Sequence, residues 1–378
     1  MQQKTEVIII GAGASGLMAA LSAAENGAGV LVLEHMPSAG QKLLLTGNGR
    51  CNFTNSDVSV RHYHSLSSSE SSGAKDREKT DAFLSEVLRQ FSFSDCIQSF
   101  RSLGIEEEIR HYRFDNTGYV YPAKGGAELV LKALLKKADE LGVKFIFQAK
   151  LSSITPSGNG YILGWHVPSA GHTVFQEQYA DTVILAAGSN ACPKTGSDSS
   201  IYPFLKSLGL SDAFTGFYPA LCALYSKDPL LSDWKGRRAE GEASLSVSEM
   251  PVRTESGEIQ FNEHSISGIP VMQLSRYAAA ALKEEKPVSL TVRIPDPSGG
   301  DPLMDHSFAI HRTSGFDRAQ CCTGGIRPDT VDAKTMESKI CPKIYICGEL
   351  LDIDGDCGGY NLHFAWATGS IAGKNAAL

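Results

Sequence analysis

Three glycines near the start of the chain, Gly11, Gly13 and Gly16, have the G-x-G-x-x-G spacing of a turn that receives a pyrophosphate. They follow the apolar run EVIII and precede the small-residue stretch LMAALSAAEN, so the turn would join a buried strand to a helix. In such a turn the first glycine allows the bend, the second admits the phosphates, and the third lets the helix pack closely. The N–H groups of a helix beginning near Ala14 and Ser15 would then bind the anion.

An acidic residue, Glu34, ends the next apolar run, GVLVLE, 18 residues after Gly16. A carboxylate at this distance accepts hydrogen bonds from the ribose of an adenine dinucleotide. The strand–turn–helix–strand order gives the motif its weight, because a glycine triplet alone also occurs in turns that bind nothing. A glycine-rich turn without a ligand is the alternative.

A second group of hydrogen-bonding residues forms the stretch TGNGRCNFTN, residues 46–55. Its glycines and asparagines tolerate left-handed backbone, and its Asn and Arg side chains donate several hydrogen bonds each. Phe53 is its only large apolar residue, so the stretch cannot bury a helix or strand face. The composition favours a loop around a ligand, with a polar turn that caps the core as the alternative. Arg50 is then either a solvated surface charge or a cation beside that ligand.

The third group lies near the C-terminus. The apolar run KIYICGE ends on Gly348 and Glu349, and the glycine-rich acidic loop LLDIDGDCGGYN leads into a helix expected to begin near Asn361. A helix N-terminus carries partial positive charge and attracts anions. Two such helix starts, far apart in the sequence, suit an elongated dinucleotide that needs contacts along its length.

A buried sheet must position these three groups. The runs EVIII, GVLVLE, VKFIFQ and TVFQEQYADTVILAAGS predict strands, and AFLSEVLRQF and AELVLKALLKKADELG predict helices among them, an α/β pattern. Between about Cys192 and Pro297, short alternating segments such as EASLSVSE and PVSLTVRI predict a β-rich insertion with one helix, GIPVMQLSRYAAAALKE. We therefore expect a Rossmann domain in two parts, residues 1–190 and 316–378, interrupted by an inserted domain, residues 191–315. PDPSGGDP is expected to be a connector, and residues 65–81 a surface loop.

The bulk composition excludes several classes of protein. The 378 residues, with 42% hydrophobic and 20% charged side chains, describe a globular chain, and its net charge of −7 argues against nucleic acid as main partner. No apolar run reaches the roughly 18 residues of a membrane span. The nine cysteines contain no C-x-x-C pair, so we expect reduced thiols, no metal site and a cytoplasmic protein. Cys321 and Cys322 are expected to be two thiols, with a vicinal disulfide as the alternative.

With these segments in hand, the chain resembles the BaiN-like flavoproteins, which include aminoacetone oxidase and bile-acid 4,6-dehydro-reductases. The resemblance covers nearly the whole chain and rests on GAGASGLMAA, GQKLLLTGNGRCNFTN, YPALCAL, ISGIPVMQLSRYAAAALK, KTMESKI and GELLDIDGDCGGYNLHFAWATG. It implies FAD held by a glutathione-reductase-like Rossmann domain, and an inserted β-rich, barrel-like substrate domain. Non-covalent FAD is expected, because no histidine or cysteine stands in a known flavinylation motif.

The resemblance also implies where FAD lies. The segment after the second strand would line the pyrophosphate and the flavin, Glu349 would serve the ribityl side, and the N–H groups near Asn361 and Leu362 would face the flavin N1/C2=O edge. The residues expected to bind FAD are Gly11, Gly13, Ala14, Ser15, Gly16, Glu34, His35, Gly40, Gln41, Lys42, Thr46, Gly47, Asn48, Gly49, Arg50, Cys51, Asn52, Ala187, Gly188, Gly348, Glu349, Asp354, Gly359, Tyr360, Asn361 and Leu362.

The chain departs from the family in three places. The stretch PDPSGGDPLMDHSFAIHRTSGFDRAQ is too short for the small helical subdomain that members usually carry. A Cys321–Cys322 pair replaces non-cysteine residues, and His363 replaces a glutamine. His363 is either a proton donor in the flavin-facing helix or a packed or exposed imidazole. It joins Arg50 and Tyr360 as the weak candidates for catalytic residues.

The reaction is left between two oxidoreductase chemistries. No second G-x-G-x-x-G follows a strand, so NAD(P)H would dock only transiently. The preferred function is NAD(P)H-linked reduction of a conjugated C=C bond in a small, enone- or steroid-like molecule. An amine oxidase that uses oxygen is the alternative, and a non-catalytic nucleotide sensor is the alternative of another class. The sequence does not indicate the oligomeric state.

Overall fold

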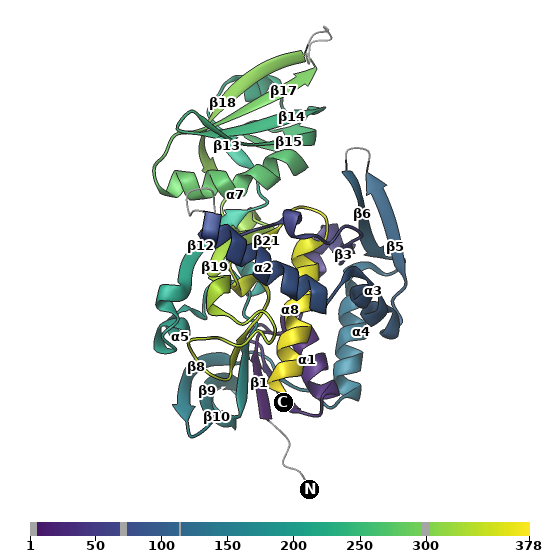
Figure 1. Cartoon of the computed structure of the whole chain (residues 1–378), viewed down its shortest axis with the longest axis vertical. Helices are drawn as coiled ribbons and strands as arrows, with labels where there is room; N and C mark the ends of the chain where they lie inside the picture. The colour runs from purple at the N-terminus through teal and green to yellow at the C-terminus, as the bar shows by residue number, and fades with distance from the viewer. Residues whose placement is uncertain (1–5, 69–73, 113–114, 296–302) are drawn as a thin grey trace. The chain divides into compact units, whose positions relative to one another are not determined.

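The chain forms two compact units, as seen in a computed structural model that describes residues 6–68, 74–112, 115–295 and 303–378 (Figure 1). The first unit consists of Met1–Ser189, Thr195–Gly216 and Gly324–Leu378. The second consists of Asn190–Lys194 and Phe217–Thr323. Residues 195–216, which we expected to belong to the insertion, thus pack with the first unit. Residues 316–323, which we expected to belong to the second part of the Rossmann domain, lie in the second unit.

A five-stranded parallel sheet is the centre of the first unit, in the order β20-β11-β1-β2-β7. Its strands are β1 (Glu6–Ile10), β2 (Gly29–Leu33), β7 (Lys144–Ile146), β11 (Thr182–Leu185) and β20 (Ile344–Ile346). They are short and apolar, as strands covered on both faces are. Because all run in parallel, the residues that follow them, Gly11, Glu34, Ala186 and Gly348, meet at one edge of the sheet.

Two helices from opposite ends of the sequence, α1 (Ala14–Glu25) and α8 (Tyr360–Ala376), lie side by side against this sheet (Figure 1). A Cβ added to Gly369 would lie 2.4 Å from the Ser15 carbonyl oxygen, and one on Gly373 would lie 2.2 Å from that of Ala19. The two backbones are therefore in direct contact, which only glycine permits at these positions.

The first unit also contains the longer helices α2 (Ala74–Gln90), α3 (Phe93–Ser102) and α4 (Gly126–Glu140). The expectation of a surface loop over 65–81 is wrong from Ala74 onward, where α2 begins, and residues 69–73 of that stretch lie outside the described residues. Lysine, glutamate and arginine favour helix, and Thr80 begins the buried face that Phe83, Leu84 and Val87 continue. A polar composition is therefore compatible with a helix that buries a single face.

Small sheets surround the core. Strands β5 (Glu107–Tyr112), β6 (Asp115–Pro122) and β3 (Thr54–Asn55) form one, and β4 (Tyr63–His64) pairs with β21 (Asp354–Gly355). A meander contains β8 (Lys150–Ser157), β9 (Gly160–Ser169) and β10 (His172–Ala180), while β12 (Phe214–Ala220) pairs with β19 (Cys321–Ile326). Short helices α5 (Tyr202–Ser207) and α6 (Leu230–Asp233) lie between strands.

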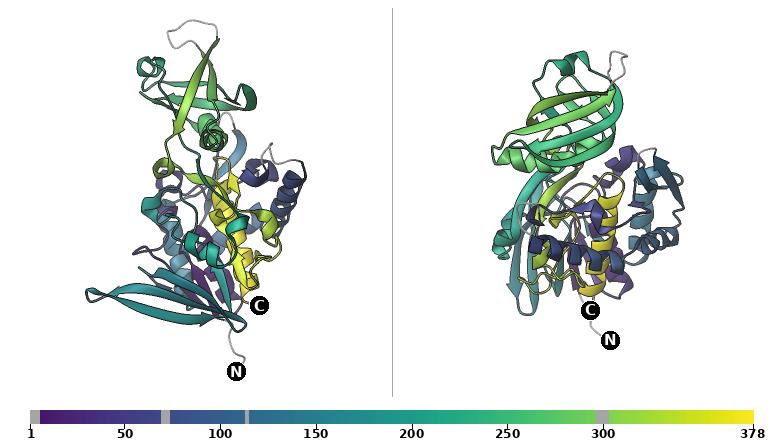
Figure 2. Two further views of the ribbon diagram at one scale, coloured as in Figure 1. Left: turned by 90° about the vertical axis from the view of Figure 1, so that its left-hand side faces the viewer. Right: turned by 45° about the horizontal axis from the view of Figure 1, so that its top comes forward.

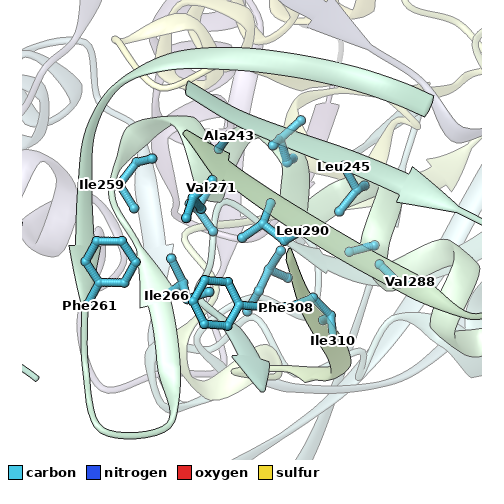
Figure 3. Packing of buried hydrophobic residues seen from close by; sticks show 14 of the residues in the cluster. Ala243, Leu245, Ile259, Phe261, Ile266, Val271, Val288, Leu290, Phe308 and Ile310 are labelled. Atoms are coloured by element: carbon cyan, nitrogen blue, oxygen red, sulfur yellow. The ribbon is translucent and has the colours of Figure 1, made fainter. Parts of the chain in front are cut away.

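The second unit is a closed six-stranded barrel, which confirms the predicted barrel-like insertion (Figure 2). Its order is β13 (Leu224–Ser226), β16 (Ser265–Ser267), β15 (Met250–Phe261), β14 (Arg238–Val247), β17 (Val288–Pro295) and β18 (Leu303–Thr313). Helix α7 (Ile269–Lys283) is the predicted amphipathic helix. Phe261, Phe308, Leu290 and Val271 pack inside the barrel (Figure 3).

The expected connector lies, except for Pro295, outside the described residues. From Leu303 to β19 the chain forms β18 and one short turn, in keeping with a stretch too short for a helical subdomain. Cys321 and Cys322 are both buried thiols.

The close contact between α1 and α8 predicts that a larger side chain at the crossing destabilises the fold. Gly369→Ala should lower the free energy of unfolding by about 1–3 kcal/mol, because its methyl group must displace the backbone at Ser15. Urea unfolding of the FAD-free protein measures the change. The exposed Lys374, on the same helix, supplies the control variant Lys374→Ala, which should stay within about 0.5 kcal/mol of the parent. Equal stability of both variants would contradict the close crossing.

Candidate functional site

The three glycines of the first turn are needed for different reasons. Gly11 has φ 103°, and a Cβ there would lie 2.5 Å from the Ala186 carbonyl oxygen. A Cβ on Gly16 would lie 2.0 Å from the carbonyl oxygen of Gly11. Gly13 has an ordinary φ of −81°, and a Cβ there would meet no described atom within 4 Å. Folding thus requires the outer two, whereas Gly13 leaves open space at the start of α1, as a bound pyrophosphate needs.

Glu34 is buried, and its carboxylate forms hydrogen bonds that hold this turn in place. Its carboxylate accepts hydrogen bonds from the N–H groups of Ala12, at 2.7 Å, and Met36, at 2.8 Å. A carboxylate has about four lone-pair positions, so two remain for ribose hydroxyls. His35 lies beside it, with Nε2 3.8 Å from Asp198 Oδ2. Glu34 thus lies at the turn, and the roles of Glu34 at the ribose and of His35 at the cofactor stay predictions.

The segment after β2 returns to the same turn. The N–H of Gly40 donates to the Ala12 carbonyl oxygen at 2.9 Å, and Lys42 forms an ion pair with Glu349. Gly348, just before that glutamate, has φ 68°, and a Cβ there would collide with the Ser15 side chain. Predicted residues far apart in the sequence are thereby brought to one place. Ala187 and Gly188 follow β11 at the same edge of the sheet.

The donor-rich stretch adopts the left-handed backbone predicted from its composition. Gly47, Asn48, Gly49 and Cys51 all have φ between 55° and 81°. Burial raises the pKa of the Cys51 thiol to about 12, so it is an inert thiol that fills space.

Two neighbouring side chains of this stretch have different surroundings. Arg50 is exposed: its Nε donates to the Gly47 carbonyl oxygen at 3.1 Å, and its guanidinium lies 5.2 Å from the centre of the Tyr121 ring. A role for Arg50 at the flavin stays a prediction. Asn52 Oδ1 is buried and finds no hydrogen-bond partner among the described residues. A buried acceptor of this kind suits a ligand that brings a donor.

The last residues of the stretch hold α8 rather than a ligand. Trp366 Nε1 donates to the Phe53 carbonyl oxygen at 3.0 Å, and Asn55 Nδ2 donates to that of Gly358 at 2.9 Å. Gly359, with φ 97°, passes so close to Thr54 that an added Cβ would lie 2.4 Å from its carbonyl oxygen. The stretch therefore lines the loop before α8, and its place beside the cofactor stays a prediction.

His363 is a packed imidazole, and the structure does not support it as a proton donor. The ring is fully buried, its Nε2 donates to the Phe91 carbonyl oxygen at 3.1 Å, and its Nδ1 lies 2.8 Å from Thr54 Oγ1. Because both nitrogens are engaged inside the protein, neither is available to a substrate. Burial also lowers the pKa of His363 to about 4, so the ring is neutral near pH 7.

The loop before α8 is closed by its own residues. The Asn361 side chain donates to the Gly355 carbonyl oxygen at 3.0 Å and accepts from the Gly355 N–H at 2.9 Å. Tyr360, the first residue of α8, is buried, and its ring stacks on His62 with centroids 4.4 Å apart. Leu362 is half-buried in the first turn. The helix start is thus fixed by side chains, which leaves the orientation of its N–H groups well defined.

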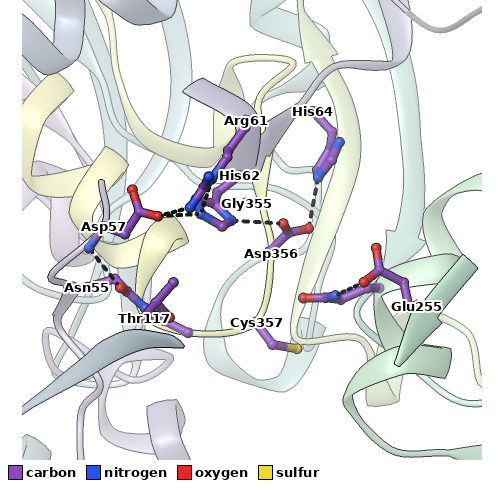
Figure 4. Close-up of polar contacts among 12 residues, drawn as sticks. Asn55, Asp57, Arg61, His62, His64, Thr117, Glu255, Gly355, Asp356 and Cys357 are labelled. Carbon is purple, nitrogen blue, oxygen red and sulfur yellow. Dashed lines mark hydrogen bonds and ion pairs between the residues drawn. The ribbon is translucent and has the colours of Figure 1, made fainter. Parts of the chain in front are cut away.

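A polar cluster beside this loop escaped the sequence analysis. Asp356 lies between two imidazoles, with Oδ1 2.8 Å from His64 Nε2 and Oδ2 3.3 Å from His62 Nδ1 (Figure 4). The histidines alternate in RHYH, a pattern that puts both on one side of a strand, and this was the available signal. Their partner Asp356 is almost 300 residues away in sequence, and only the fold identifies it. Among the described residues no cluster is suited to hold a metal ion.

Two further aspartates lie in the same loop. Asp354, a predicted cofactor residue, is buried within β21. Asp352 accepts hydrogen bonds from the N–H groups of Leu66, Ser67 and Gly324 at 2.8–3.0 Å, and from the Ser65 hydroxyl. Burial outweighs these donors and raises the pKa of Asp352 to about 6. This aspartate ties residues 65–67 to the loop.

The whole chain matches one protein family. Residues 5–375 fit the family described as HI0933-like protein Rossmann domain. The chain belongs to the HI0933-like family. It is a flavin-dependent oxidoreductase whose Rossmann domain binds FAD, which agrees with the expected cofactor and with the residues gathered around Gly13. Among the described residues, no helix is long and apolar enough to cross a membrane.

Curated relatives cover nearly the full length. The chain is 31% identical to a 3-dehydro-bile acid delta(4,6)-reductase of Clostridium scindens, over 98% of each chain. It is 26% identical to a ribosomal RNA dihydrouridine synthase of Haemophilus influenzae, over 97% of each. Among solved structures, a 3-ketosteroid-Δ4-(5α)-dehydrogenase of Rhodococcus jostii superposes with a TM-score of 0.54 at 15% identity, covering 100% of this chain and 98% of that one. The structural likeness supports the fold.

Substitutions at different glycines of the turn should affect cofactor binding and folding separately. Gly13→Ala should cost less than about 1 kcal/mol of folding stability, the scale of an N-cap change. Its methyl group would occupy the pyrophosphate position, so FAD affinity should fall roughly tenfold or more. Ultrafiltration of added FAD measures the affinity, and urea unfolding of the FAD-free protein measures stability. Gly16→Ala is the contrasting variant, because it should damage the fold itself. Unchanged FAD affinity in Gly13→Ala would contradict this site.

His363 and Asp352 make opposite contributions to stability between about pH 4 and pH 6. The pKa of His363 is lowered in the folded protein, so its contribution to folding stability is lost as pH falls through this range. The pKa of Asp352 is raised, so its contribution is lost as pH rises. His363→Gln should therefore flatten or reverse the acid loss of stability of the FAD-free protein, by on the order of 1–3 kcal/mol, and Asp352→Asn should steepen it. Urea unfolding across the pH range tests this. Parallel profiles for parent and variants would contradict the assignment.

Proposed function

We propose that the protein catalyses FAD-dependent reduction of a C=C bond conjugated to a carbonyl in a small molecule, with NAD(P)H as a transient reductant. The observation that carries the proposal is the full-length, 31% identical relative named for a delta(4,6)-reductase activity, together with a dinucleotide turn whose Gly13 faces open space. The second relative points the same way, because dihydrouridine is uridine whose ring C=C bond, conjugated to a carbonyl, has been reduced.

The residues of the chain would bind and orient the cofactor. The N–H groups at the start of α1, with Gly13 and Ser15, would hold the pyrophosphate, and Glu34 would hold the adenosine ribose. Lys42 and Glu349 stand as an ion pair beside the turn. When bound, FAD supplies the hydride-transfer chemistry.

The start of α8 would act on charge that develops during reduction. Its N–H groups and dipole present partial positive charge, and the bonds of Asn361 to Gly355 hold them in place. Preorganised donors of this kind stabilise negative charge without rearranging. The side chain that gives a proton to the substrate is not assigned; Tyr360, buried at the helix start, stays a candidate.

Three other functions make different demands. An amine oxidase would consume oxygen with a small primary amine and need no nicotinamide. A nucleotide sensor would bind FAD without turnover. Reduction of uracil in RNA, suggested by the relative's name, would need attraction to a polyanion, which the net charge of −7 opposes.

One anaerobic experiment separates these functions. NADH or NADPH should bleach the yellow absorbance of the purified protein, and a conjugated enone steroid should restore it with a stoichiometric loss of the double bond. The corresponding saturated ketone is the matched control, and Gly13→Ala protein without FAD is the protein control. Bleaching by a primary amine but not by NADH or NADPH, with the colour returning when air is admitted, would overturn the proposal in favour of the amine oxidase. Recovery of colour only with unmodified ribosomal RNA would favour uracil reduction, and the absence of bleaching by any of these reductants would favour the sensor.

A further inference from the structure

The polar cluster around Asp356 joins the loop before α8 to the segment that follows the donor-rich stretch. Strand β4 pairs antiparallel with β21, with His64 opposite Asp354 and Tyr63 opposite Gly355. One more backbone bond, from the Asp356 N–H to the His62 carbonyl oxygen at 2.9 Å, extends this pairing. A two-residue ladder is weak by itself. The side chains of the cluster therefore decide how firmly the loop is held.

His62 is placed between two carboxylates. Its Nδ1 lies 3.3 Å from Asp356 Oδ2, and its Nε2 lies 3.4 Å from Asp57 Oδ2 (Figure 4). Its ring is 17% exposed and Asp356 is 7% exposed, so water screens these contacts only in part. An imidazolium donates from both nitrogens and satisfies both carboxylates at once, which a neutral ring cannot do.

A neighbouring cation gives the cluster a second arrangement. Arg61 pairs with Asp57, and its Nε lies 3.1 Å from His62 Nε2. Two donors cannot share one hydrogen bond, so this contact suits a deprotonated Nε2 that accepts from Arg61, and the Asp57 contact suits a protonated one. Burial opposes the charged ring, but the hydrogen bonds to Asp356 and Asp57 outweigh it and raise the pKa of His62. Among the described residues, His64, on the other oxygen of Asp356, and the tyrosines Tyr63 and Tyr360 also lie around His62.

The cluster is connected to the flavin-facing helix start. The His62 ring stacks on Tyr360 at an interplanar angle of 17°, and the Tyr63 hydroxyl donates to the Tyr360 carbonyl oxygen at 3.3 Å. Tyr360 is the first residue of α8, and the adjacent Asn361 is bonded to Gly355 in β21. A change at His62 therefore acts on the first turn of α8 through two consecutive residues.

We propose that His62 is a positioning residue: as an imidazolium bridging Asp57 and Asp356 it holds the loop 354–361 and the start of α8 in the cofactor-binding arrangement. FAD retention then depends on pH. The inference concerns cofactor binding alone and holds whichever substrate the enzyme reduces.

The direction of the dependence follows from the charge. A bridge made by protonated His62 is complete at low pH, and it is lost as pH rises through the pKa of His62 in the folded protein. The parent protein should therefore bind FAD roughly tenfold less tightly at about pH 9 than at about pH 6.5, the effect expected for lost hydrogen bonds to charged groups.

The test is FAD affinity as a function of pH, measured by flavin fluorescence on the full chain. His62→Phe keeps the ring stack on Tyr360 but removes the charge, so it should bind FAD at low pH as weakly as the parent does at high pH, with a flat profile. Asp356→Asn should likewise reduce the change in FAD affinity between low and high pH. His172→Gln, at an exposed position of β10, is the matched histidine control and should keep the parental profile.

Each outcome decides the proposal. A parental profile without a fall in affinity above about pH 6.5 overturns it, whatever the variants do. A pH-dependent fall that survives in His62→Phe also overturns it, by assigning the titration to another group. If His62→Phe is too unstable to purify, the parental profile and Asp356→Asn decide. Failure of enone reduction with a normal FAD profile would instead contradict the proposed reaction and leave the role of His62 intact.

Discussion

The direct contact between the backbones of α1 and α8 is the constraint on which the site depends. Gly369 and Gly373 let α8 lie on Ser15 and Ala19, and Gly348 lets the chain before α8 pass the Ser15 side chain. Because Gly369 meets Ser15 and Gly373 meets Ala19, the two helices run parallel and their N-termini point in the same direction. A longer side chain on either surface would separate the two ends of an extended dinucleotide site by more than hydrogen bonding tolerates.

Local patterns carried most of what could be predicted about the fold. The glycine turn, Glu34 and the strand runs have short-range physical causes, and the alternation between about Cys192 and Pro297 likewise indicated the β-rich insertion. The loop expected at 65–81 shows the limit. There the helix-forming tendency of charged residues and a buried face beginning at Thr80 outweighed a composition typical of loops.

The rest of the site depends on contacts between distant residues. The role of Asp356 depends on its contacts with His62 and His64, which are far from it in sequence. The role of His363 likewise depends on its distant partners Thr54 and Phe91. The stretch 46–55 illustrates the same limit in another way. Its composition indicated hydrogen bonding but not the partner of each side chain. Asn55 donates to the Gly358 carbonyl oxygen in the loop before α8, whereas the buried Oδ1 of Asn52 has no partner among the described residues.

The interlocking of α1 and α8 also bears on biosynthesis. The ribosome makes the glycine turn first and α8 hundreds of residues later, with the complete barrel between them. The barrel has its own core and can fold while the polypeptide is still growing, whereas the partly made Rossmann half must wait with an uncovered α1 surface. The cofactor site needs both helices, so FAD binding must wait until α8 has been made.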